Sequence, residues 1–115
     1  MNETQAIAYW RKLHLDDLVI KLHGGRFQSS MPDIIHISKA TGEVMFLEVK
    51  SVPGSTLPWS KCRLDQDLML KKMSRMRANA KYLVWSNSMD CFYFVDPCLV
   101  KEGESYHLSG AWRAE

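Results

Sequence analysis

Residues 31–50, MPDIIHISKATGEVMFLEVK, predict a hairpin of two apolar strands around which the rest of the chain is organised. The first apolar run covers residues 34–37 and the second covers residues 44–49, with a turn at residues 39–42 between them. Gly42 suits this turn because glycine adopts a positive φ at little steric cost. Charged residues at one end of so apolar a hairpin therefore need an explanation.

Asp33 follows Pro32 at the start of the first strand. Glu48 and Lys50 project from one face of the second strand, because side chains alternate along a strand. In a hairpin Asp33 and Glu48 can converge, and two carboxylates with a lysine beside them form a site for a divalent cation. The alternative is a pair of solvated strand ends, since Pro-Asp is common at turns and charges are common at strand edges.

Length and composition predict a single domain over residues 1–115. The hydrophobic content of 46% and the charged content of 24% are ordinary for a globular protein, which at this size can bury its own core. The net charge is only +2, so nucleic-acid binding must come from local clusters of charge. The sequence shows no signal peptide and no apolar run of membrane-spanning length, which predicts an intracellular protein without membrane contact.

Cysteine and histidine spacing predicts neither disulfides nor a zinc site. An odd number of cysteines without paired spacing is typical of reduced thiols. These cysteines are Cys62, Cys91 and Cys98. The histidines lack the spacing of a metal cluster, and structural roles are expected for each of them: His14, His23, His36 and His107.

Residues 2–13 predict a helix. Asn2 suits the N-cap, Glu3 follows in the first turn, and apolar residues recur at helical spacing. Glu3 shares a helix face with Ala6 and Ile7, because residues three and four apart are neighbours on a helix. Glu3 can therefore complement the helix dipole or point into a site beneath the helix, and both readings stay open.

Residues 24–30, GGRFQSS, form a polar loop between the first predicted strand and the hairpin. Arg26, Ser29 and Ser30 offer contacts to phosphate oxygens. A plain connecting loop is the alternative. The position of the loop directly before the proposed metal site favours contact with a substrate.

After a loop at residues 51–60, a helical pattern begins at residue 61 or 63 and continues to about residue 79. Gln66 falls on the inward side of the helix start, where a buried amide needs a partner such as a carboxylate or a metal-bound water. Basic residues outnumber acidic ones here; a solvated helix face is the alternative, but the neighbouring metal site favours a surface for a polyanion. The candidate DNA contacts are Lys61, Arg63, Lys71, Lys72 and Arg75.

Residues 82–86 and 91–95 predict two further strands, and residues 96–115 show no clear pattern. With a first strand at residues 18–23, the element order predicts a small α/β sheet. Large apolar side chains near the C-terminus can either close the edge of this sheet or form an interface with a second copy: Phe92, Tyr93, Phe94, Leu99, Tyr106 and Trp112.

The run Pro32-Asp33 followed by Glu48-Val49-Lys50 resembles the signature of the PD-(D/E)xK nuclease superfamily. The likeness extends over residues 2–85 and implies a restriction-endonuclease-like core, in which helices flank a mixed β-sheet. It also implies a Mg²⁺-dependent endodeoxyribonuclease, in which Mn²⁺ can substitute for Mg²⁺. The metal would be held by Asp33, Glu48 and the Val49 carbonyl, and Lys50 would orient the attacking water.

Glu3, the glycine pair before Arg26 and Gln66 are together similar to two subgroups, the virus-type replication-repair nuclease (VRR-NUC) domains and the Holliday-junction resolvases of cells and phages. VRR-NUC domains usually have a glycine shortly before Pro-Asp, where this chain has Ser29 and Ser30 and is more similar to the resolvases. The resemblance implies that Glu3 and Gln66 support the metal site. It also implies that a homodimer from a phage or bacterial host cuts branched DNA.

Other function classes remain open on the sequence. The chain can be a nuclease-fold module that binds DNA or assembles with partners without cutting. It can also be an interaction protein without a nucleic-acid role, in which case the basic helix would show no salt-dependent DNA binding.

Overall fold

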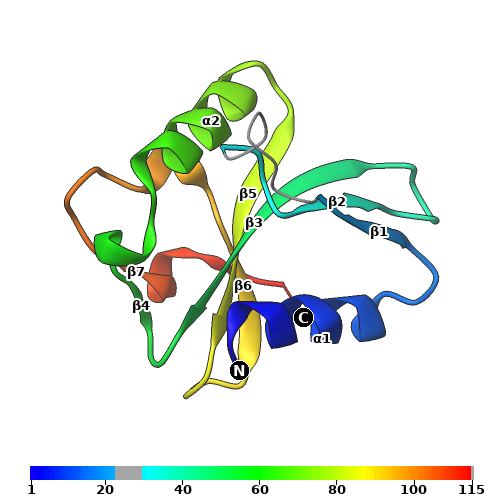
Figure 1. Cartoon of the computed structure of the whole chain (residues 1–115), viewed down its shortest axis with the longest axis horizontal. Helices are drawn as coiled ribbons and strands as arrows, with labels where there is room; N and C mark the ends of the chain where they lie inside the picture. The colour runs from blue at the N-terminus through cyan, green and yellow to red at the C-terminus, as the bar shows by residue number, and fades with distance from the viewer. Residues whose placement is uncertain (23–29, 115) are drawn as a thin grey trace.

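The structure is a computed structural model, and it describes residues 1–22 and 30–114 (Figure 1). A six-stranded sheet with the order β1-β2-β3-β5-β6-β8 forms its centre. Its strands are β1 (Leu18–Lys21), β2 (Ile34–Ile37), β3 (Val44–Val52), β5 (Asn79–Ser86), β6 (Cys91–Val95) and β8 (Trp112–Arg113). Because β3 and β5 are parallel and the other neighbours are antiparallel, the sheet is mixed, as predicted.

Helices α1 (Glu3–Leu13) and α2 (Leu64–Arg75) cover opposite faces of this sheet. Trp10 of α1 packs in one apolar cluster with Leu83 of β5, whereas Leu70 of α2 packs in another cluster with Tyr82. Tyr82 and Leu83 are neighbours in one strand, so their side chains point to opposite faces. The predicted arrangement of helices flanking a mixed sheet is thus confirmed.

The N-terminal helix begins where the sequence predicts it. The Asn2 side chain accepts a hydrogen bond of 2.8 Å from the Gln5 backbone N–H, and the Gln5 side chain accepts one of 2.9 Å from the Asn2 N–H. This reciprocal capping box satisfies two of the N–H groups that a helix start leaves unpaired. It fixes the first turn of α1, which carries Glu3.

The predicted hairpin is also confirmed, but its second strand is longer than predicted. Ile34 pairs with Leu47 in the β2–β3 ladder, and Gly42 has a φ of 72° in the turn. β3 then continues to Val52, so Glu48 and Lys50 lie inside a strand and not at its end, which corrects the prediction. The reason is tertiary, because β5 pairs with β3 along residues 45–52 and supports the strand after β2 has ended.

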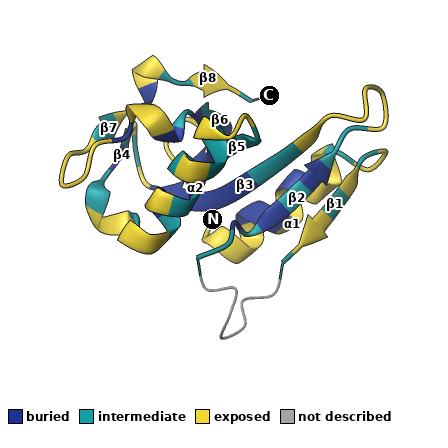
Figure 2. Ribbon diagram, turned by 90° about the horizontal axis from the view of Figure 1, so that it is seen from above, coloured by how far each residue is buried: buried dark blue, intermediate teal, exposed yellow. Residues whose placement is uncertain are grey.

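This difference in strand length creates an opening in the sheet. β3 has β5 on one side throughout, whereas its β2 neighbour starts only at Ile34. The segment of β3 beyond Leu47 therefore has one edge without a β2 residue beside it. Figure 2 shows that this same part of β3 is buried, while the hairpin end of the strand is exposed. The side chains of Glu48 and Lys50, which lie on this part of β3, are therefore buried.

Other predicted boundaries were wrong. Residues 51–60 were predicted to be a loop, but they include the end of β3 and β4 (Thr56–Leu57), which pairs with β7 (Tyr106–His107). Helix α2 ends at Arg75 and not near residue 79, because residues 79–81 join β5 beside β3. Short 3₁₀ turns complete the described chain: η1 (Trp59–Lys61), η2 (Pro97–Leu99) and η3 (Leu108–Gly110).

The large apolar side chains near the C-terminus belong mostly to the core. Phe92 and Tyr93 are buried and Phe94 is half-buried, whereas Leu99 and Trp112 are exposed. Of the two alternatives left open for these groups, packing within the domain's own sheet therefore holds for most of them, and an interface with a second copy does not. Among the described residues, no helix is long and apolar enough to cross a membrane.

Candidate active site

The gap beside β3 is a cavity of about 340 Å³. It brings together five of the six residues that the sequence proposes for the site, all but Val49, although they come from different elements. The lining residues are Glu3, Thr4, Ile7, Lys21, Asp33, Glu48, Lys50, Arg63 and Gln66. Both helices, the β1 edge and the start of the hairpin therefore meet at this cavity.

Asp33 is held in place by the backbone of β3. Its Oδ2 accepts a hydrogen bond of 2.9 Å from the Val49 N–H. Asp33 precedes the Ile34–Leu47 pair of the antiparallel ladder, so it lies beside Glu48, as predicted. The Val49 carbonyl points to the same side as the Val49 N–H, because the two groups of one strand residue face the same neighbour. Three oxygen-bearing groups thus converge at one edge of β3.

Glu48 is the most unusual ionisable group of the cavity. Only 2% of the residue is exposed, and burial together with the nearby Asp33 charge raises the pKa of its carboxyl to about 8, although Lys50 opposes this shift. Glu48 Oε2 lies 3.3 Å from Lys50 Nζ, and no group in the described part of the chain donates a hydrogen bond to Oε1. A carboxyl with this pKa is mostly protonated at pH 7 unless a further cation stabilises its charged form.

Lys50 joins β3 to α2. Its buried Nζ lies 3.3 Å from Glu48 Oε2 and donates a hydrogen bond of 3.3 Å to Gln66 Oε1. Gln66 is half-buried in the first turn of α2, on the inward side that the sequence predicts. The buried amide therefore has a lysine as its partner, whereas the sequence suggests a carboxylate or a water molecule.

Glu3 and two cations complete the lining. Glu3 is exposed on the first turn of α1 and borders the cavity, so the reading in which it points towards the site agrees with its position. Lys21 and Arg63 also line the cavity. Sequence reasoning missed Lys21, which ends β1 and pairs with Ile34 next to Asp33. Only the β1–β2 register, which the sequence does not display, could have identified it.

The candidate DNA-binding residues differ in their surroundings. Lys61, Lys72 and Arg75 are exposed, as is Arg63, although its guanidinium bonds Asp65 at 2.8 Å. Lys71 is only half-exposed and bonds the buried Asp67. Ser30 is half-buried beside the hairpin, while Arg26 and Ser29 lie outside the described residues.

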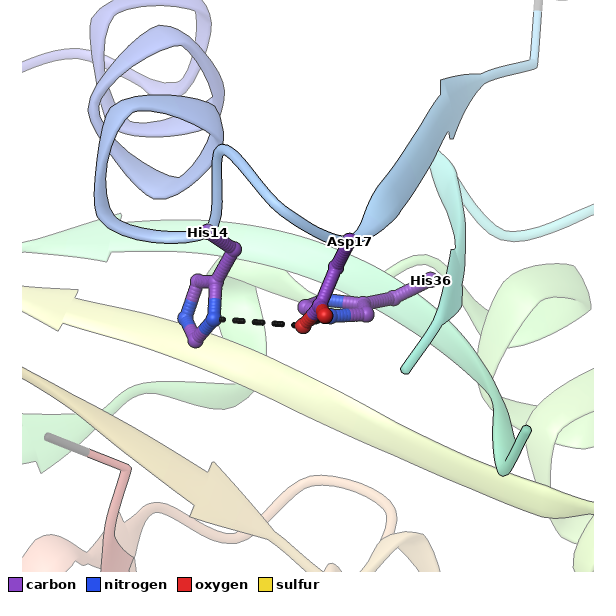
Figure 3. A group of neighbouring side chains, drawn as sticks. All are labelled: His14, Asp17 and His36. Carbon is purple, nitrogen blue, oxygen red and sulfur yellow. Dashed lines mark hydrogen bonds and ion pairs between the residues drawn. The ribbon is translucent and has the colours of Figure 1, made fainter. Parts of the chain in front are cut away.

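A second polar cluster lies away from this cavity and was not expected. His14 and Asp17, three residues apart, meet the distant His36 at the end of α1 (Figure 3). Their ligand atoms lie within 4.8 Å of one another, a spacing that could hold a metal ion. The spacing of the histidines along the chain did not indicate that two of them meet here. A cavity of about 230 Å³ borders the cluster.

Hydrogen bonding argues against a metal in this cluster. Trp10 Nε1 donates a bond of 2.8 Å to His36 Nδ1, and an indole nitrogen can only donate. His36 therefore carries its proton on Nε2 and donates it to Asp17 Oδ2 at 2.7 Å. A metal-binding histidine uses one nitrogen for the metal and donates the proton of the other, which the Trp10 bond prevents here. The arrangement joins α1 to β2 and serves structure.

The hydrogen bonds that Asp17 accepts favour the charged form of its carboxyl. Asp17 Oδ1 accepts a bond of 3.0 Å from the Lys39 N–H in the hairpin turn. This backbone bond and the His36 bond lower the pKa of the Asp17 carboxyl. Asp17 is therefore a fixed acceptor that ties together the ends of α1 and of the hairpin.

Comparison with known proteins supports the fold. No protein-family model matches the chain, and a search of curated proteins also finds no match. Among solved structures, the chain is similar to the Holliday junction resolvase Hjc of the archaeal hyperthermophile Archaeoglobus fulgidus, with a TM-score of 0.67. The sequence identity is 15%, and the likeness covers 96% of this chain and 92% of that chain. The chain therefore has the restriction-endonuclease-like fold of this resolvase.

Proposed function

We propose that the chain is a metal-dependent endonuclease that hydrolyses phosphodiester bonds in DNA. The observation that carries this proposal is the buried Glu48 carboxyl, which shares a cavity with Asp33 and Lys50. Burying two carboxylates next to each other is costly unless a cation or a proton compensates them. Sites that keep such a pair accessible from a cavity are candidates for function.

The donor groups fit Mg²⁺, with Mn²⁺ as a substitute. Asp33, Glu48 and the Val49 carbonyl are oxygen ligands, which hard divalent cations prefer. The Glu48 Oε1 that no described group bonds is an acceptor at the right place for a cation. When bound, the metal supplies charge neutralisation at the phosphate and activation of water.

The neighbouring side chains orient the reacting groups. Lys50 offers a cation that can orient the attacking water and offset charge on the phosphate oxygens. Gln66 holds Lys50 through the bond at 3.3 Å, and Glu3 supports the site from α1. These assignments rest on the positions of the side chains around one cavity.

The DNA backbone would lie across the cavity mouth and the outer face of α2. Arg63 and Lys21 border the cavity, where each offers a cation for a phosphate group. Lys61, Lys72 and Arg75 extend the basic surface along η1 and α2. We assign contacts with phosphate also to Arg26, Ser29 and Ser30, because their loop leads directly to the hairpin.

We further propose that the preferred substrate is a four-way junction and that the working unit is a homodimer. The candidate catalytic groups in the described part of one chain form one site, whereas resolution of a junction needs two symmetric cuts in opposing strands. A two-fold dimer supplies two sites related in the same way. The likeness of the fold to a Holliday junction resolvase supports this choice of substrate.

The proposal is tested with purified protein on labelled four-way junction, flap, duplex and single-stranded DNA, with Mg²⁺ and with a chelator. We expect Mg²⁺-dependent cleavage of the junction, which Asp33→Asn, Glu48→Gln and Lys50→Ala each reduce at least about 100-fold. DNA affinity should change little, because binding comes from the basic surface.

Glu102→Gln is the matched control, since Glu102 is an exposed carboxylate on the C-terminal segment. This variant should cut at the wild-type rate. A Glu48→Gln variant that cuts equally fast would refute the site. Salt-dependent DNA binding without any cleavage would instead favour an inactive DNA-binding module.

A further inference from the structure

A buried carboxylate that the proposed reaction does not use follows Gln66, a residue of the cavity lining, in the chain. Asp67, in the first turn of α2, is only 1% exposed. Its Oδ1 accepts a hydrogen bond of 2.6 Å from the Tyr82 hydroxyl, and its Oδ2 accepts one from Lys71 Nζ. Both carboxylate oxygens therefore have partners, and the Lys71 ammonium offsets the buried charge.

This network connects the helix to the strand pair that carries the proposed catalytic groups. Tyr82 is the β5 partner of Glu48 in the parallel β3–β5 ladder. Gln66 precedes Asp67 in α2 and accepts the hydrogen bond from Lys50. The contacts thus run from Lys50 to Gln66, on to the next helix residue Asp67, and from there to Tyr82 in the strand beside Glu48.

The start of α2 depends on this tertiary contact. Arg63 occupies the N-cap position and makes no side-chain capping bond, in contrast to Asn2 at the start of α1. A helix start without a side-chain cap leaves N–H groups unpaired and is prone to fray. The Tyr82–Asp67 bond is buried, so it fixes the turn that α2 does not secure by itself.

The Tyr82 hydroxyl keeps its proton and can therefore always donate the hydrogen bond to Asp67. Burial, followed by the hydrogen bond to Asp67, raises the pKa of Tyr82. The phenol therefore stays protonated at the pH values in which nucleases are assayed. The Tyr82 hydroxyl therefore remains a donor to Asp67 over this pH range.

We propose that Tyr82 and Asp67 are positioning residues, which hold the first turn of α2 so that Gln66 meets Lys50 in the active site. This inference rests on the proposed nuclease function, because it assigns Lys50 and Gln66 to that site. The alternative is a polar contact that only stabilises the core. The two interpretations differ in one expectation: a positioning role requires that loss of the Tyr82 hydroxyl lowers the cleavage rate only when Gln66 is present.

A double-mutant cycle distinguishes the positioning role from a purely stabilising contact. The variants are Tyr82→Phe, Gln66→Ala and the combination, measured as single-turnover cleavage rates at saturating DNA. We expect Tyr82→Phe to lower the rate about tenfold in the wild-type background and less than about twofold in the Gln66→Ala background. The Kd for DNA should stay within about twofold in each case, because the basic surface is unchanged.

Tyr93→Phe is the matched control. Tyr93 is also a buried tyrosine, but its hydroxyl bonds Met89 Sδ in the β5–β6 turn. This variant should cut at the wild-type rate. Equal rate losses for Tyr82→Phe in both backgrounds, or no loss at all, would overturn the proposal.

Two further measurements keep the result interpretable. Asp67→Asn, which retains an acceptor for Tyr82, should cut faster than Asp67→Ala; equal rates would count against the anchor. The NMR signals of the Gln66 side-chain amide report its contact with Lys50 without cleavage. They should shift in Tyr82→Phe and not in Tyr93→Phe, and unchanged signals refute the positioning role.

A wild-type protein that cuts no DNA refutes the proposed function instead.

Discussion

At the scale of single residues, two neighbouring lysines of the same helix differ in burial and therefore in their expected roles. Lys71 and Lys72 are adjacent in the basic helix, and sequence reasoning assigns both to DNA. In the structure Lys72 is exposed, whereas Lys71 bonds the buried Asp67 with only 15% of its side chain accessible. The difference follows from helix geometry, since Lys71 is four residues after Asp67 and shares its face.

Substituting each lysine by methionine should therefore give opposite results. Lys71→Met leaves the Asp67 charge buried without its cation, so the free energy of unfolding should fall by about 3 kcal/mol. Lys72→Met should change stability by less than about 0.5 kcal/mol, but it should weaken DNA binding and lower the salt slope by about one. Urea denaturation and binding titrations at several salt concentrations measure both. Similar effects of the two variants would contradict the structure.

At the scale of elements, α1 is attached to the hairpin by polar bonds inside an apolar contact. Trp10 packs against the sheet and also donates to His36, which donates in turn to Asp17. Buried polar groups are stabilising only as a satisfied set, because each unpaired member keeps its desolvation cost. The position of α1, and with it that of Glu3, depends on this chain of bonds.

Removing one side chain of this hydrogen-bonded set should therefore lower the free energy of unfolding by more than the value of its own hydrogen bond, because its partner stays buried and unpaired. Trp10→Phe leaves His36 Nδ1 without its donor and His36→Phe leaves the Trp10 N–H without its acceptor, so each should lose about 3 kcal/mol of stability. The double variant should lose at least about 1 kcal/mol less than the sum of the two. Urea denaturation tests this, with Trp112→Phe on the exposed edge strand as the control. Additive losses would show that the bond contributes nothing.

At the scale of the whole molecule, the candidate catalytic residues within the described ranges line one shared cavity. The proposed reaction on a four-way junction needs two such sites. The large side chains near the C-terminus, which offered material for an interface, mostly fill the core around β6. Most of these side chains are therefore not available for an interface with a second copy.

We expect the protein to sediment with twice the chain mass of 13.3 kDa at the concentrations that support junction cleavage. Cuts in the junction should appear as symmetric pairs in opposing strands. Sedimentation velocity and sequencing gels of end-labelled arms measure these properties. A monomer that degrades linear ends as readily as junctions would leave a nuclease without the resolvase specificity proposed here.

The sequence by itself determined the hairpin, the shared strand face of Glu48 and Lys50, the inward position of Gln66 and the start of α1. These features depend on local rules: the alternation of strand side chains, the period of a helix and the chemistry of a cap. The same rules placed Asp33 beside Glu48, because a short turn fixes the register of a hairpin. The fold class followed from the order of such elements.

Only the tertiary structure decided the rest. The length of β3 depends on its parallel neighbour β5, which lies some thirty residues away in the sequence, and the Lys50 partner depends on where α2 packs. The same holds for Lys21 at the cavity, for the Asp67–Tyr82 bond and for the meeting of His14 with His36. Contacts between distant segments leave no periodic signal in one sequence, because they depend on packing and not on the spacing of residues along the chain.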